Sequence, residues 1–174
     1  MIKKNFLILL VCSFFGMAGQ ELPKDSLPKI YRLKQFTTEK QISIRVGVGF
    51  QKAFYSELGL ALHKCTYGDT GFFSNDFYSA LEWTPNKEHN IYGLKVGYEA
   101  NAFLLNLGLE LKYQTDFMKK DVVITPKIGL GIFGDANIFY GYNISTNNNP
   151  FTQTIGNHQM GIIFNINNHF LNYQ

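Results

Sequence analysis

The sequence predicts an all-β protein, and more narrowly an eight-stranded antiparallel up-and-down transmembrane β-barrel. Three observations support this prediction. Apolar residues alternate with polar or small residues in eight stretches after residue 40, the polar side of these stretches is rich in glycine and carries balanced charges, and residues 1–18 have the composition of a secretory signal peptide. We expect residues 19–40 to form an extended periplasmic segment and residues 41–174 to form the barrel.

The composition fits one folded domain. Of 174 residues, 45% are hydrophobic and 16% aromatic, and only 17% are charged, which excludes a disordered chain. The formal net charge is +3 without basic runs, so the sequence shows no nucleic-acid-binding surface.

The first 18 residues indicate export by a cleavable signal. Lys3 and Lys4 precede an apolar run over 6–15, and small residues follow at 16–18. The run is shorter than the roughly 20 residues of a spanning helix. We exclude a lipoprotein because Val11 precedes Cys12 where a lipoprotein signal has a small residue.

Cys65 is therefore the single cysteine expected in the mature chain. An internal disulfide is then impossible, although the compartment outside the inner membrane would permit one. We expect Cys65 to be a small buried hydrophobic residue.

The first predicted strand shows the repeating pattern most clearly. Ile42, Ile44, Val46 and Val48 are apolar and the residues between them are polar or glycine, which is the period of a half-buried strand. The eight stretches cover 41–51, 57–63, 77–83, 92–99, 102–113, 122–132, 138–144 and 159–167.

Turn-forming residues lie between these stretches and predict a meander. Because successive strands with short links pair antiparallel, each strand should neighbour the next along the chain. We place the link between the fourth and fifth strands at Ala100 and Asn101. Periplasmic links are expected near 68–71, 100–102 and 134–136, and outer loops near 84–90, 114–121 and 145–157.

Two barrel architectures share this alternation and differ in which face meets water. A soluble lipocalin-like barrel encloses a ligand with its apolar face and exposes its charges. A transmembrane barrel turns its apolar face to lipid and its polar face to the interior.

The polar face of this chain fits the interior of a narrow transmembrane barrel. It is rich in small residues, and its charges balance four against four, as an internal ion-pair network requires. The small residues are Gly47, Gly49, Gly59, Ala61, Ala80, Gly93, Gly97, Gly108, Gly129, Gly131, Gly141 and Gly161. The charges are Arg45, Lys95, Lys112 and Lys127 against Glu57, Glu82, Glu99 and Glu110.

The apolar face carries aromatic residues near strand ends, as expected of a girdle at the membrane interface. The predicted girdle consists of Phe50, Trp83, Tyr92, Tyr98, Phe103, Tyr113 and Tyr142.

These features together resemble small outer-membrane β-barrels of the OmpA and OmpX kind. The resemblance covers about residues 41–173 and is one of pattern, so it concerns architecture rather than activity. The chain departs from that family in two places: Gln174 follows Tyr173, where such chains commonly end on an aromatic residue, and the first link, 51–54, is short.

Some barrels of this size are lipid A deacylases, which need a histidine beside a serine nucleophile. Their typical His-x-Ser-Asn run is missing, because Lys64, Cys65 and Thr66 follow His63, and His158 precedes no serine. We expect His63 to face inward and to bond Glu57 or a neighbouring strand.

The acidic residues and the histidines suggest two further chemistries. Glu99 and Glu110 lie on adjacent predicted strands and could form an acid–base pair, but nearby lysines favour structural ion pairs. The histidines lack metal-ligand spacing, so we expect neither a metal nor any other cofactor.

We therefore expect a non-enzymatic protein of the Gram-negative cell envelope, with a side-chain-filled polar lumen and a structural or surface-interaction role. The alternatives are a porin-like narrow solute channel, a lipid A-modifying enzyme and a soluble lipocalin-like binding barrel. The expected partners are outer-membrane lipid, lipopolysaccharide and the barrel-assembly machinery, and the expected state is a monomer in the outer membrane.

Overall fold

The computed structural model describes residues 36–68, 71–86 and 89–172. The predicted signal peptide, most of segment 19–40 and Tyr173 lie outside the described residues. The barrel belongs to a compact unit that spans residues 34–174.

The described residues form strands joined by turns and loops. They contain no helix long and apolar enough to cross a membrane. The strands are β1 (Thr37–Gly68), β2 (Gly71–Thr84), β3 (Ile91–Ala102), β4 (Leu105–Thr115), β5 (Lys120–Ile132), β6 (Ala136–Tyr142), β7 (Ile144–Ser145) and β8 (Ile155–Ile166).

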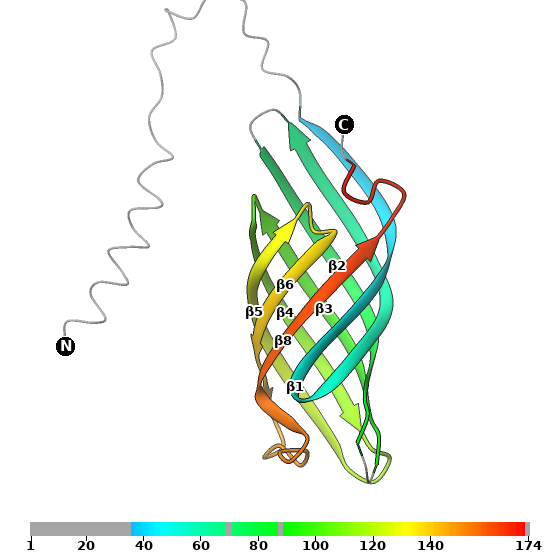
Figure 1. Cartoon of the computed structure of the whole chain (residues 1–174), viewed down its shortest axis with the longest axis vertical. Coiled ribbons are helices and arrows are strands. Elements are labelled where there is room, and N and C mark those ends of the chain that lie inside the picture. The colour runs from blue at the N-terminus through cyan, green and yellow to red at the C-terminus, as the bar shows by residue number, and fades with distance from the viewer. Residues whose placement is uncertain (1–35, 69–70, 87–88, 173–174) are drawn as a thin grey trace, which may run out of the picture. The chain divides into compact units, whose positions relative to one another are not determined.

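β1 is a hairpin whose two arms supply two walls of the barrel. Its backbone reverses at Lys52, which has a positive φ of 78°, and the ribbon turns sharply there (Figure 1). Far from this turn, the Thr38 and Thr66 hydroxyls lie 3.0 Å apart, and the Tyr67 hydroxyl donates to Glu39. The first arm (residues 37–51) therefore runs antiparallel to the second arm (residues 53–68).

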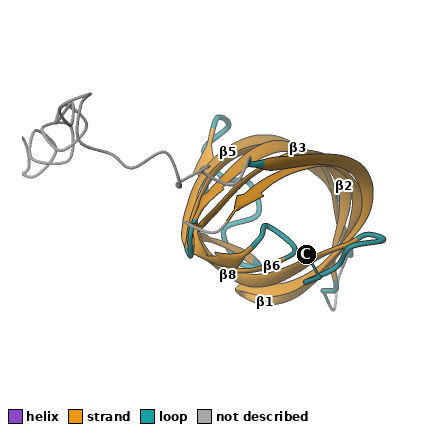
Figure 2. Ribbon diagram, turned by 90° about the horizontal axis from the view of Figure 1, so that it is seen from above, coloured by secondary structure: helices purple, strands orange, loops and turns teal. Residues whose placement is uncertain are grey.

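The remaining pairings close the sheet into a barrel, which Figure 2 shows as a ring of strands. The second arm of β1 pairs with β2, and β3, β4, β5 and β6 follow in turn. β7 continues β6 along β5, and β8 pairs with both β6 and the first arm of β1. All these pairings are antiparallel, so the predicted eight-stranded up-and-down barrel is confirmed. Closure leaves the barrel without open sheet edges along its length.

The two ends of the barrel differ in the length of their connections (Figure 1). One end, which we call the terminal end, holds the first and last described residues, the paired ends of β1 and β2 at Gly68 and Gly71, and the links 103–104 and 133–135. The opposite end, the loop end, holds the β1 turn, the described residues 85–86 and 89–90 between β2 and β3, and the loops 116–119 and 146–154.

Most predicted strand boundaries differ from the structure by a few residues; β2, for example, begins at Gly71 and β8 at Ile155. The β3–β4 turn is at Phe103 and Leu104, because Asn101 pairs with Asn106 and Ala102 with Leu105. The predicted link at Ala100 and Asn101 was wrong, since Phe103 itself takes the positive φ of 53° and no glycine or asparagine marks the turn. The first strand also begins at Thr37, within the segment predicted to be an extended N-terminal segment.

Side chains alternate between a buried interior and an exposed outer face along every long strand. The outward positions are overwhelmingly large and apolar: Ile42, Leu60, Leu81 and Leu130, for example, are each at least 60% exposed. The buried positions are mostly polar or charged. The burial pattern is thus the reverse of that in a water-soluble domain.

Small inward residues make room for large inward side chains on neighbouring strands. Gly97 is the register partner of Tyr78, and a Cβ at Gly97 would overlap the ring and hydroxyl of Tyr78. At Gly93 a Cβ would lie 3.2 Å from Cδ of Lys112 and 3.3 Å from Cβ of Glu82, so a shift of a few tenths of an ångström would relieve the contact.

We predict that Gly97→Ala destabilises the barrel by about 1–3 kcal/mol, because Tyr78 is held by neighbouring polar groups and cannot give way. Gly93→Ala, the matched control on the same strand, should cost much less. Urea unfolding of both variants in detergent micelles, followed by circular dichroism, measures the difference. An equal decrease in the free energy of unfolding of the two variants would contradict this account of how the interior is packed.

Candidate functional site

The eight charged residues predicted to face inward all lie inside the barrel, and none is more than 4% exposed. They come from both arms of β1 and from β2, β3, β4 and β5. The structure brings them together in one connected set, which we call the charge network: Arg45, Glu57, Glu82, Lys95, Glu99, Glu110, Lys112 and Lys127.

Arg45 joins the two arms of β1 to β3 and β8. Its Nε donates to Glu57 at 3.0 Å and its Nη2 to Glu99 at 2.7 Å, while Nη1 donates to Asn165 at 3.3 Å. The guanidinium lies 3.6 Å from the centroid of the Tyr78 ring, a cation–π contact. Arg45 therefore has a hydrogen-bond acceptor for each of its three guanidinium nitrogens and an aromatic ring against one face of the guanidinium.

Lys95 is the cation with the most carboxylate neighbours. Its Nζ lies 2.5 Å from Glu57, 2.6 Å from Glu82 and 3.6 Å from Glu110. Lys112 shares Glu82 at 3.1 Å. These contacts link four consecutive strands from inside the barrel: the second arm of β1, β2, β3 and β4.

Lys127 binds the two carboxylates that were weighed as an acid–base pair. Its Nζ is 2.6 Å from Glu99 and 3.3 Å from Glu110. Register places Glu99 opposite Gly108, and Glu110 opposite Gly97. The two carboxylates thus meet at a shared lysine.

The charge network can fill and stiffen the lumen. An eight-stranded barrel has an interior just wide enough for side chains, and the guanidinium and ammonium groups of Arg45, Lys95 and Lys112 have no solvent-exposed area. A buried charge without a partner costs several kcal/mol, so each ion here depends on its neighbours. Neighbouring side chains thus cover these three cationic groups completely.

Sequence reasoning did not select three polar residues that complete the network. Tyr78 accepts from Lys127 at 2.6 Å and donates to Glu110 at 2.7 Å. Gln51 accepts from Lys112 at 3.1 Å, and the Tyr55 ring faces Lys95 at 5.0 Å. Tyr78 and Gln51 could have been selected, because both fall on the inward side of the alternating pattern of their strands. Tyr55 could not, because it lies between two predicted strands, just after the part of the chain predicted to be a link.

His63 lies inside the barrel toward the terminal end. Its Nδ1 is 2.6 Å from Asp76 and its Nε2 is 3.7 Å from Asp135. His63 therefore faces inward as expected, and of the two expected partners it bonds the neighbouring strand, at Asp76, and not Glu57. Cys65 is also buried. Among the described residues, no group of three or more histidine, cysteine or acidic side chains could hold a metal ion.

All residues of the predicted girdle are exposed on the outer face. Tyr98 and Phe103 lie toward the terminal end, where Phe103 forms the β3–β4 turn. The other members lie toward the loop end: Phe50, Trp83, Tyr92, Tyr113 and Tyr142.

The three loops predicted to face outward meet at the loop end. Asn86 donates to the Thr154 hydroxyl at 3.1 Å, and the Ala53 amide donates to the Thr154 carbonyl at 3.1 Å. Phe151 is buried in an apolar cluster with Ile91 and Ile155. Loop 146–154 is thereby attached to the start of β3, to the β1 turn and to residue Asn86 at the loop end.

A hollow of about 390 Å³ lies among these loops, lined by residues of all three, including His89, Asp116, Lys119 and Thr152. Its lining mixes a carboxylate, an ammonium group and hydroxyl groups. Backbone amides of Lys119 and Met118 donate to Asp116 at 2.6 and 2.9 Å, which lowers the pKa of this carboxyl. The loop therefore presents an ionised Asp116 at neutral pH.

We predict that Lys95→Met destabilises the barrel by about 3–5 kcal/mol, because it leaves buried carboxylates in excess. Adding Glu110→Gln should restore much of the loss, since three pairs then remain: Arg45 with Glu57, Lys112 with Glu82, and Lys127 with Glu99. Denaturant unfolding of both single variants and the double variant gives the coupling energy.

If the double variant were no more stable than the sum of the two single losses predicts, the charge network would not behave as a coupled unit.

Comparisons with protein-family models, with curated proteins and with solved structures found no match for this chain.

Proposed function

We propose that this protein is an integral β-barrel of the bacterial outer membrane, exported by its predicted signal peptide, whose polar lumen is closed by side chains. Its role is structural or in surface interaction, without enzymatic activity. The partners that follow from this proposal are outer-membrane lipid, lipopolysaccharide and, during insertion, the barrel-assembly machinery.

The outer apolar belt is the observation that carries the proposal. Outward positions on every wall hold large hydrophobic side chains, such as Leu60, Leu107, Ile138 and Ile162, each at least 40% exposed. Contiguous apolar surface of this extent is rare on monomeric soluble proteins. An apolar belt of this kind is stable in contact with lipid tails. Because the barrel is closed, its backbone N–H and C=O groups are paired between strands and need no water there.

The interior argues against two of the alternative functions. A lipocalin-like barrel needs an apolar lumen for its ligand, whereas this lumen holds the charge network. A conducting channel needs a wet path, and Arg45, Lys95 and Lys112 are fully buried across the lumen.

The position of His63 supports a non-enzymatic role. A lipid-modifying hydrolase needs its histidine and nucleophile to open onto the membrane. His63 is 1% exposed, and its ring is engaged by Asp76 inside the barrel.

The loop end supports a surface-interaction role. It gathers the three longest described connections and their mixed-charge hollow at one end of the barrel. In the proposed orientation this end faces outward, since outer-membrane barrels have short periplasmic turns and longer outer loops.

The proposal predicts that the protein fractionates with outer membranes and needs detergent for extraction. On a gel run without boiling, it should migrate as a compact band that shifts to the full-length position after heating. A water-soluble monomer obtained without detergent would contradict the proposal and favour the lipocalin-like alternative.

Planar-bilayer recording of the same preparation distinguishes a closed lumen from a channel. We expect no steady conductance, because the charge network leaves no solvent path at its level. A stable open conductance from the intact protein would replace the closed barrel with a narrow channel.

A further inference from the structure

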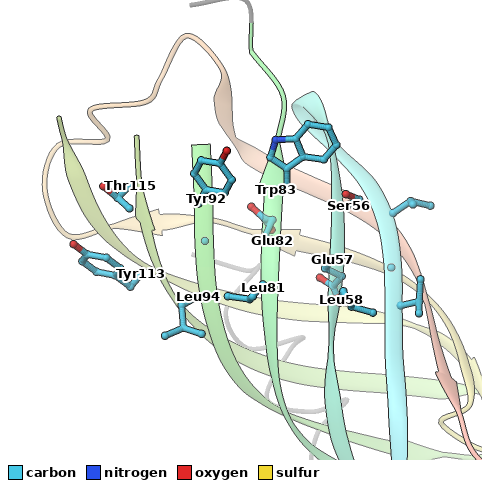
Figure 3. Close-up of a pocket in the computed structure, with 14 residues that line it drawn as sticks. Ser56, Glu57, Leu58, Leu81, Glu82, Trp83, Tyr92, Leu94, Tyr113 and Thr115 are labelled. Carbon is cyan, nitrogen blue, oxygen red and sulfur yellow. The ribbon is translucent and has the colours of Figure 1, made fainter. Parts of the chain in front are cut away.

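A hollow of about 790 Å³ lies on the outer face of the barrel near the loop end. Toward the middle of the barrel it is lined by Leu58, Leu81 and Leu94, which are register partners on the second arm of β1, β2 and β3. Toward the loop end it is lined by the next such row, Ser56, Trp83 and Tyr92. Figure 3 shows the two rows side by side.

Differences in side-chain size create this hollow. Ser56 is the register partner of Trp83, so a short side chain stands beside the largest one on the outer face. The rings of Trp83 and Tyr92 form a wall at the loop end, and the leucines form an apolar floor below them. A hollow in a lipid-facing surface must be filled by lipid, because empty apolar space forfeits van der Waals contacts.

The loop-end row adds polar groups to one end of the hollow. Trp83 and Tyr92 carry an N–H and a hydroxyl, and Figure 3 draws the indole nitrogen on the side facing Tyr92. Tyr92 pairs with Thr115, and Thr115 pairs with Lys120. Lys120 thus extends the same row, about 10 Å from Tyr92 at the spacing of two strands. It stands just outside the lining of this hollow and lines a smaller neighbouring hollow that shares Tyr113.

Lys120 is available to a ligand on this face. It is exposed at the start of β5, and it forms no salt bridge with any acidic residue in the described part of the chain. Lys120 therefore places an ammonium group at the interfacial end of this face, where it attracts the phosphate of a lipid headgroup.

We propose that this hollow is a specific site for a phosphorylated membrane lipid, with an acyl chain on the leucine floor and the phosphate at Lys120. The proposal rests on the membrane location proposed above and names one lipid position within it. The hollow has the volume, the mostly apolar lining and the few polar groups at one end that are typical of ligand pockets.

The chain contains a single tryptophan, and that residue lines the hollow. Its fluorescence therefore reports on this site directly. The full chain in detergent micelles is titrated with phosphatidic acid brominated on its acyl chains, and in parallel with brominated diacylglycerol, which lacks the phosphate. We expect the phosphatidic acid to quench Trp83 at a several-fold lower mole fraction.

Two variants test the two halves of the site. Lys120→Gln should weaken the preference for phosphatidic acid about fivefold by removing the cation. Ser56→Phe should fill the hollow and reduce the lipid that remains bound, counted per protein by native mass spectrometry. The matched controls are Lys64→Gln, an exposed lysine toward the terminal end, and Ile138→Phe, an exposed position on β6, which contributes no residue to the hollow. Both should bind lipid as the unaltered chain does.

The outcomes separate this inference from the proposed function. One outcome is that the protein is embedded in micelles while both lipids quench Trp83 equally and Lys120→Gln leaves this quenching unchanged. In that case the hollow holds only non-specific lipid, so the lipid-site inference is wrong and the membrane proposal still stands. If neither lipid quenches Trp83 and the chain needs no detergent, the membrane proposal fails as well.

Discussion

The structure depends on one constraint: a strand sends successive side chains to opposite faces, and closure of eight strands makes one of those faces a narrow, enclosed space. Every inward side chain must therefore fit among its neighbours and satisfy its polar groups there. Glycine beside tyrosine, as at Gly97 and Tyr78, solves the first requirement. The charge network solves the second, because each buried cation is within reach of a carboxylate. The outer face is then free to be apolar.

The same alternation explains how much the sequence could predict. Period two over eight stretches indicates eight strands, and balanced charges on the glycine-rich side indicate which side is enclosed. These arguments need only the identity and phase of residues. For this reason the architecture and the inward position of residues such as Lys95 and Glu110 follow from sequence, and the structure places them inside the barrel.

Partners within the lumen could not be predicted in the same way, because they depend on register and on three-dimensional closure. Arg45 and Asn165 are 120 positions apart and meet only when β8 pairs with the first arm of β1. The turn at Phe103 escaped prediction because a large apolar residue takes a conformation usually left to glycine or asparagine. The engagement of His63 by Asp76 likewise follows from the register of the second arm of β1 with β2.

The central claim is that the exposed apolar face touches lipid chains. In a Cys65→Ala background, single cysteines at Leu60, Leu107 and Ile162, and a control at Lys119 in a loop, are labelled with a small fluorophore and the protein is inserted into vesicles. Quenchers attached to acyl chains should quench the first three sites strongly, while aqueous iodide should quench only the label at Lys119. Strong iodide quenching at Leu60, Leu107 and Ile162, with no effect of the lipid-borne quencher, would show that water covers this face and would contradict the account.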